Sequence, residues 1–228
     1  YSIGKYYTPS KIKDGEEADL EDFTNTDNFM VDYAIKFITR EFGSSDEPQS
    51  EDFSMNSNDR AVDWLLNDPN KRIDFEFFQQ NINDKAVDWM IKKQNEINSF
   101  NDKLKESNDG NVPKKRNIIY SEFSRNSNDK AVEWLIQHLD KIDYFWFSKN
   151  TNDKAVEWLI RYHSDEINYL NFSQNTNDKA VEWLILHPDK IYFEQFSQNT
   201  NDKAVEWLIL HPDKIIYFNF AYNKNIKA

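Results

Sequence analysis

The sequence predicts an all-α protein, a right-handed or curved α-solenoid of about seven two-helix repeats of 24–25 residues with an N-terminal arm. The first observation behind this prediction is the segment Asn-Thr-Asn-Asp-Lys-Ala-Val-Glu-Trp-Leu-Ile, which stands at 175–185 and again at 199–209. The second is its spacing, since the central alanine recurs from Ala61 to Ala204 at intervals of 25, 45, 24, 25 and 24 residues. The third is that the same positions stay apolar in every copy. A period of this length is typical of solenoids, whose units bury their apolar faces against their neighbours.

The first 50 residues precede the clear copies. Residues 1–22 carry an acidic run and predict an acidic N-terminal arm or cap. Residues 23–50 predict a degenerate first repeat followed by a loop, with Met30 in the alanine position and Tyr33 in the tryptophan position. Terminal repeats of solenoids are usually atypical because one side has no neighbour to cover.

The remaining segments follow from the spacing. Repeats are expected over 51–100 and 117–220. The long interval between them predicts an inserted polar loop at 101–116, which contains Gly110 and Pro113. Residues 221–228 match the beginning of the motif and predict the start of a truncated further repeat. Either the array continues in the full protein, or this last partial turn serves as a cap.

Within one repeat, the first asparagine of the motif is expected to cap a helix of about three turns. The helix should end near His211 in the last copy, because Pro212 disfavours helix for the residue before it. A short helix or 3₁₀ turn should follow, since its apolar positions do not fit a long 3.6-residue period. The predicted caps are Asn56, Asn81, Asn126, Asn150, Asn175 and Asn199.

The motif tryptophans are expected in the core, where they would stack between repeats. Positions that stay apolar in every copy form a broad stripe, whereas the position of Leu210 is polar in most copies and lies on the exposed face. The predicted stacking residues are Trp64, Trp89, Trp134, Trp158, Trp183 and Trp207.

No catalytic, metal or cofactor site is predicted, so an enzyme is not expected. His138, His187 and His211 occupy one repeat position, too far apart for a shared ion, and suit a helix C-terminus instead. The carboxylates recur in rows, as expected of a solvated face. The chain has four glycines in no phosphate-binding pattern, and a small-molecule ligand is not expected.

Candidate protein-binding residues are those whose type departs from the equivalent positions in other copies. Trp146 stands where other copies place Phe77, Asn171 or Gln195. Phe145 stands where two other copies have Glu76 and Glu194, and both aromatics suggest a contact patch, or else packing against the 101–116 loop. The candidate binding residues are Phe77, Phe145, Trp146 and Arg161.

Composition bounds the partners. The net charge of −12, half of it from residues 1–50, disfavours nucleic acid and tolerates basic protein partners. Lys114, Lys115 and Arg116 could form a nuclear import signal or a phosphate contact, or simply a solvated basic turn. The chain has no cysteine, no apolar run long enough to span a membrane and no visible secretion signal. We therefore expect a reducing intracellular compartment.

The pattern Ser-x-Asn-x-Asn-x-x-Ala-Val-x-Trp-Leu-Ile, followed by Pro-Asp-Lys-Ile and an aromatic, resembles the short asparagine-rich helical repeats of proteins encoded by giant DNA viruses of protists and algae. The resemblance covers residues 51–228 except the inserted loop. It departs where those relatives often place proline after the first asparagine, because this chain has Thr151, Thr176 or Thr200 there. The resemblance implies a non-enzymatic viral repeat protein, located in the host cytoplasm or the virion, with capsid proteins among its partners. The predicted function is a scaffold for protein–protein interaction, and the alternative is a minor capsid or cement protein of a large DNA virus.

Overall fold

The computed structural model describes residues 54–67, 73, 75–107 and 118–227. Over these residues every regular element is a helix and there is no strand, so the prediction of an all-helical fold is confirmed for them. The chain forms two compact units, Tyr1–Ile119 and Tyr120–Ala228, and each is described by itself. The predicted arm at 1–22, the degenerate repeat at 23–50 and the basic turn at 114–116 lie outside the described residues.

Three helices lie wholly within the described part of the first unit, α3 (Asp59–Asn67), α4 (Phe75–Phe78) and α5 (Asp84–Ser107). Ala61, Val62 and Leu65 lie on one face of α3 and are fully buried or nearly so. Helix α3 packs against α5, and Phe78 of α4 is buried completely. The pattern of a long helix followed by a short one therefore begins in this unit.

Helix α5 corrects the predicted inserted loop. The sequence placed a loop at 101–116, but α5 continues to Ser107, so the first seven residues of that segment are helical. The reason is local: the copies of the second unit stop at a histidine, whereas here Lys92, Lys93 and Gln94 follow without glycine or proline. Residues 108–117 lie outside the described part of the chain.

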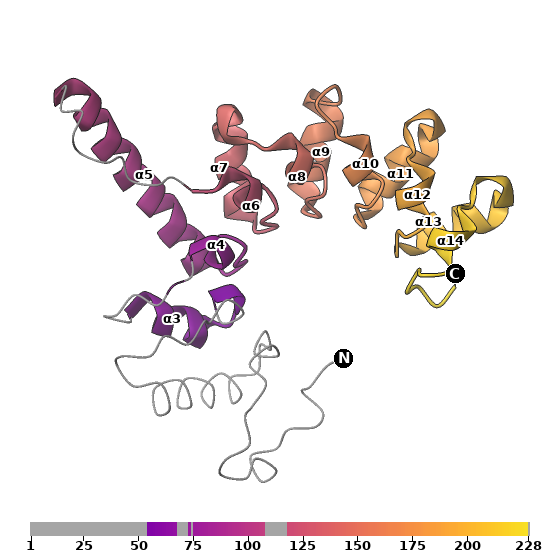
Figure 1. The fold of residues 1–228 in the computed structure, drawn as a ribbon, viewed down its shortest axis with the longest axis horizontal. Helices are drawn as coiled ribbons and strands as arrows, with labels where there is room; N and C mark the ends of the chain where they lie inside the picture. Colours follow the sequence, from indigo (N-terminus) through magenta and orange to yellow (C-terminus); the bar gives the residue numbers. More distant parts are fainter. Residues whose placement is uncertain (1–53, 68–72, 74, 108–117, 228) are drawn as a thin grey trace, which may run out of the picture. The chain divides into compact units, whose positions relative to one another are not determined.

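The second unit alternates long and short helices in chain order (Figure 1). Each long helix is formed by one copy of the motif, and each short helix is about one turn long. The α-helices are α6 (Tyr120–Ser124), α7 (Asp129–Gln137), α8 (Tyr144–Phe147), α9 (Asp153–Tyr162), α10 (Tyr169–Phe172), α11 (Asp178–Leu186), α12 (Phe193–Phe196), α13 (Asp202–Leu210) and α14 (Tyr217–Phe220). Three 3₁₀ turns follow long helices: η4 (Leu139–Lys141), η5 (Pro188–Lys190) and η6 (Pro212–Lys214).

The helix caps differ from the prediction. The second asparagine of the motif caps the helix, not the first. Asn177 has an extended backbone and accepts a hydrogen bond from the Lys179 N–H, and α11 begins one residue later at Asp178. Asn128, Asn152 and Asn201 do the same for α7, α9 and α13. Asn56, Asn81, Asn126, Asn150, Asn175 and Asn199 are therefore not the caps.

Each long helix of the second unit ends at a histidine. The backbone N–H of His187 donates to the carbonyl of Leu184, and Pro188 then starts the 3₁₀ turn. Helix α9 is one residue longer, because Tyr162 is added before His163. The His163 N–H accordingly donates one turn back to Leu159, an α-helical bond rather than a 3₁₀ one.

The core of the second unit consists of small and branched side chains on the long helices and one phenylalanine from each short helix except α14, which buries none. In α9, Ala155, Val156 and Leu159 have no exposed surface, and neither has Phe147 of α8. Consecutive long helices pack against each other, α7 on α9, α9 on α11 and α11 on α13. The alanine of each long helix is completely buried in this packing. The apolar face of each long helix is therefore buried by the neighbouring repeat that packs against it.

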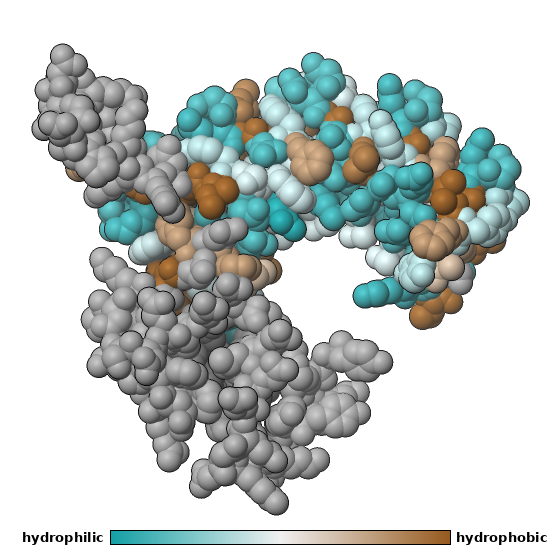
Figure 2. Space-filling model, viewed as in Figure 1, coloured by the Kyte–Doolittle hydropathy of each residue, from teal (hydrophilic) through white to brown (hydrophobic). Residues whose placement is uncertain are grey.

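The surface of this unit is mostly hydrophilic in the view of Figure 2, and apolar residues gather at the C-terminal end. Ile209, Tyr217 and Phe218 of that end are 50%, 67% and 75% exposed. The counterparts of Ile209 and Tyr217 one repeat earlier, Ile185 and Phe193, are half-buried.

Candidate functional site

A buried asparagine clamp, the first asparagine of the motif, joins each repeat to the one before it. The Asn175 Nδ2 donates to the carbonyl oxygens of Ser148 at 3.1 Å and Asn150 at 2.9 Å. Its Oδ1 accepts from the N–H of Asn177 at 2.9 Å, and the side chain is fully buried. The same donations to the preceding repeat are made by Asn81, Asn150, Asn199 and Asn223. Both ends of the amide are thus used, one for the local turn and one for the neighbour.

A buried serine two residues before the clamp links the short helices, and sequence reasoning assigned it no role. The Ser148 Oγ donates to the carbonyl of Tyr144 at 2.7 Å and accepts from the N–H of Asn168 in the next repeat at 2.9 Å. In the first unit Gln79 takes this position and makes both kinds of bond, to the carbonyl of Phe75 and from the N–H of Ile119. The sequence did contain a signal for this role, because a polar residue recurs at this position between apolar ones.

A second, exposed row of contacts runs beside the clamp. The Asn177 Nδ2 donates to Asp153 Oδ1 at 2.6 Å in the preceding repeat. The Lys179 ammonium pairs with the same Asp153 at 2.8 Å and also with Glu157. This arrangement recurs for Lys154, Lys203 and Lys227 with the acids of the repeat before each. Each ammonium is therefore shared by two carboxylates, so about half of the negative charge of the row is compensated by pairs between repeats.

These pairs shift the proton equilibria in the expected directions. Hydrogen bonds from Lys179 and then Asn177 hold the pKa of Asp153 below its ordinary value. The pKa of Asp178 is lowered in the same way by Lys203 and Asn201. Hydrogen bonds from Asp178 and Glu182 raise the pKa of Lys203 to about 12. All these groups are exposed, so solvent and salt screen the pairs.

The tryptophans lie at the junction of a long helix with the short helix before it. The Trp183 ring stacks on Tyr169 of α10, with ring centroids 5.7 Å apart. It also stacks on His187, with ring centroids 4.0 Å apart. Phe172 meets the same ring edge-on. Most of these tryptophans are half-buried, and Trp134 is 8% exposed. The fully buried aromatic of each repeat is the phenylalanine instead.

The histidines complete these stacks. The Nδ1 of His187 lies 2.7 Å from the carbonyl oxygen of Trp183, and because a carbonyl can only accept, Nδ1 carries the hydrogen. His138 and His211 repeat this bond, and His163 stacks on Trp158 at 4.0 Å despite its displaced position. Within the described segments no three His, Asp or Glu side chains are grouped so as to hold a metal ion.

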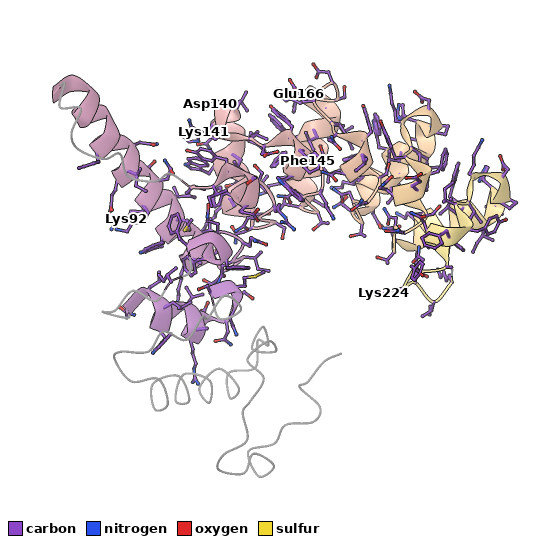
Figure 3. All side chains as sticks on the ribbon, in the orientation of Figure 1. Lys92, Asp140, Lys141, Phe145, Glu166 and Lys224 are labelled. Atoms are coloured by element: carbon purple, nitrogen blue, oxygen red, sulfur yellow. The ribbon has the colours of Figure 1, made fainter. Side chains whose placement is uncertain are left out.

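The four candidate binding residues do not lie in one unit. Phe77 is half-buried on α4 of the first unit. Arg161 is exposed on α9 and lies 3.9 Å from Glu157. Phe145 is 46% exposed on α8 (Figure 3), and its ring meets Trp146 edge-on at 5.0 Å.

Trp146 differs from Phe145 in its contacts. The guanidinium of Arg125, from the preceding repeat, lies 4.4 Å from the centroid of the Trp146 ring. In the next repeat the same position is Asn171, whose Nδ2 donates back to the carbonyl of Phe145 at 2.6 Å. Trp146 thus links two repeats by a cation–π contact where a sibling uses a hydrogen bond. The alternative partner, the 101–116 loop, has no described side chains.

Comparisons of the chain with protein-family models, with curated proteins and with solved structures give no match. The viral resemblance therefore stays a prediction. No helix in the described segments combines the length and apolar character that crossing a bilayer requires.

Proposed function

We propose that this chain is a non-enzymatic α-solenoid scaffold of about seven repeats that binds other proteins through variable outer positions. One observation carries the proposal: the bonds between repeats use residues that recur in every copy, while the outer positions beside them differ. The clamp at Asn175 and the pair at Lys179 recur one repeat later at Asn199 and Lys203.

This difference between recurring inner positions and variable outer positions favours a binding scaffold. The recurring residues fix the backbone, so side chains at outer positions can change without changing the stack. Helix α8 is the clearest case, because Phe145 is exposed where the sibling position holds Glu194. An exposed aromatic on a rigid frame is the kind of residue that anchors protein interfaces.

The test replaces Phe145 by the residue that its sibling carries. Phe145→Glu should fold with unchanged helix content, because Glu194 occupies the same position on α12. Leu170→Glu makes the same charge change at the equivalent position of the next repeat and is the matched control. Immobilised wild-type chain, Phe145→Glu and Leu170→Glu are exposed to lysate of the native source.

The expected result is a protein that the wild type and Leu170→Glu retain and Phe145→Glu loses by about tenfold, a difference of about 1.4 kcal/mol. Binding of the purified captured protein at fixed stoichiometry must then follow. Equal capture by both variants would refute Phe145 as an anchor. Presence of the chain at fixed stoichiometry in purified particles would assign the surface to a virion.

A further inference from the structure

Three repeats of the second unit place an ammonium over an aromatic ring of a short helix. The Lys141 Nζ lies 5.4 Å from the Tyr120 ring centroid, Lys190 lies 5.5 Å from that of Tyr169, and Lys214 lies 5.9 Å from that of Phe193. Each lysine also pairs with the aspartate before it, as Lys141 does with Asp140 at 2.8 Å. The chain thus supplies its own cation at these three rings.

The remaining junction, at Tyr144, has the same backbone but the opposite charge. The N–H of Glu166 donates to the carbonyl of His163 at 3.0 Å, as the N–H of Lys141 donates to that of His138 at 2.8 Å. Glu166 therefore occupies the lysine position of its siblings. Figure 3 shows Glu166 at the turn after α9, and Asp140 and Lys141 at the corresponding turn after α7.

Two independent consequences follow at this junction. The Tyr144 ring stacks on Trp158 at 6.4 Å like its siblings, but no lysine or arginine of the described residues lies over it. Asp165, the aspartate that pairs with lysine in other repeats, has no ion-pair partner within 4 Å among the described residues, and neither has Glu166. Both carboxylates are exposed. Burial first, and then Glu166 and Asp165, raise the pKa of the Tyr144 phenol, so both charges act on that ring.

We propose that Tyr144, Asp165 and Glu166 form a receptor for a lysine or arginine side chain of a partner protein. The incoming cation would take the position over the ring that Lys141 and Lys190 fill in the sibling repeats. There it would meet two carboxylates instead of one. This inference rests on the proposed scaffold function and specifies the chemistry of its partner.

The direct test uses a defined probe, the tripeptide Ac-Gly-Lys-Gly-NH₂, titrated into the full chain and followed by backbone amide NMR. Its control is the same peptide with an acetylated lysine. Two charge swaps test the position: Glu166→Lys fills the receptor with the chain's own cation, and Lys190→Glu creates a second receptor at Tyr169. Both swaps install a residue that the same position already carries elsewhere in the array.

In the wild type, the lysine peptide should shift amides around Tyr144 and Glu166, and the acetylated peptide should not. Glu166→Lys should weaken this binding at least about tenfold, and Lys190→Glu should add a second set of shifts around Tyr169. Shifts spread equally over all repeats, or binding unchanged by Glu166→Lys, would overturn the receptor.

This outcome is separable from that of the scaffold test. If the peptide fails but Phe145→Glu still loses a captured protein, only the receptor is refuted. If the peptide binds as expected but no protein is captured, the receptor stands and the scaffold function is refuted for the source tested.

Discussion

At the scale of the residue, the two asparagines of the motif have different roles although they stand two positions apart. Asn175 is buried and joins three backbone groups, two of them in the preceding repeat. Asn177 caps a helix and its remaining contacts are exposed. The same type of side chain therefore contributes a different amount to stability at the two positions, because one is buried and the other is exposed.

Asn175→Ala should lower the free energy of unfolding by about 3 kcal/mol, because it leaves buried backbone groups without partners. Asn177→Ala should cost only about 1 kcal/mol, the usual value for a lost helix cap. Denaturant melts of the two variants measure the difference. Equal losses would show that the clamp contributes no more than the cap.

Trp158 and Arg161, both on α9, provide a second comparison between two variants. Trp158 stacks on Tyr144 and His163 and meets Phe147 edge-on, so Trp158→Ala should cost about 3–5 kcal/mol. Arg161 is exposed, so Arg161→Ala should change stability by less than about 0.5 kcal/mol. Reversed magnitudes in the same melts would contradict the assignment of faces.

At the scale of the element, local signals in the sequence determined which parts could be predicted. The long helices were predictable, because His211 and Pro212 mark the end of α13 in the sequence. The single short helix or 3₁₀ turn expected after Pro212 is instead two elements, η6 and α14. The capping asparagine was not predictable, because both asparagines suit a cap and only the path of the preceding turn decides. The extension of α5 to Ser107 was also missed, since the spacing of motifs does not reveal whether the intervening residues are helical.

The candidate site was predictable only in part. Comparing copies identified Phe145 and Trp146 as departures, but not that Arg125 lies over the Trp146 ring. That contact joins residues 21 positions apart in sequence, 125 and 146, and depends on how the repeats stack. Glu166 was visible in the sequence as a change of charge, yet its meaning required seeing lysine over the sibling rings.

The exposed ion pairs between long helices predict how stability varies with pH. Lowered pKa values at Asp153, Asp178 and Asp202 contribute stability that is present above the unfolded value and lost as pH falls through the folded one. The loss should therefore begin below about pH 4. At the alkaline end, lysine pKa values raised to about 12, as at Lys203, contribute stability that is lost as pH rises toward that value.

Thermal melts between about pH 3 and pH 7 measure this effect, and about 0.5 M salt should reduce it because the pairs are exposed. A melting temperature that falls equally at low and high salt would show that the acid sensitivity has another origin.

At the scale of the whole molecule, each junction of the second unit repeats the one before it, so the array should accept a change of length by one full period. Deleting residues 175–198 removes 24 residues and brings Asn199 to the position that Asn175 held against Ser148 and Asn150. Circular dichroism should show an all-helical chain that melts cooperatively at a lower temperature, because one interface is lost.

The control deletes residues 175–186, half a period, which removes Asn175 and helix α11 and leaves η5 and α12 without their long helix. That variant should lose cooperative melting. If both deletions melt alike, the repeats do not depend on matched junctions.

The clamp also has a mechanical consequence. Because Asn175 and Asn199 each bond only to the repeat directly before them, no bond of this kind bridges more than one junction. Under tension applied to the ends of the second unit, the junctions should therefore yield one at a time rather than together. Each event should release a repeat of 24–25 residues, or roughly 80 Å of extended chain, so this part of the protein would lengthen in even steps and act as an extensible tether.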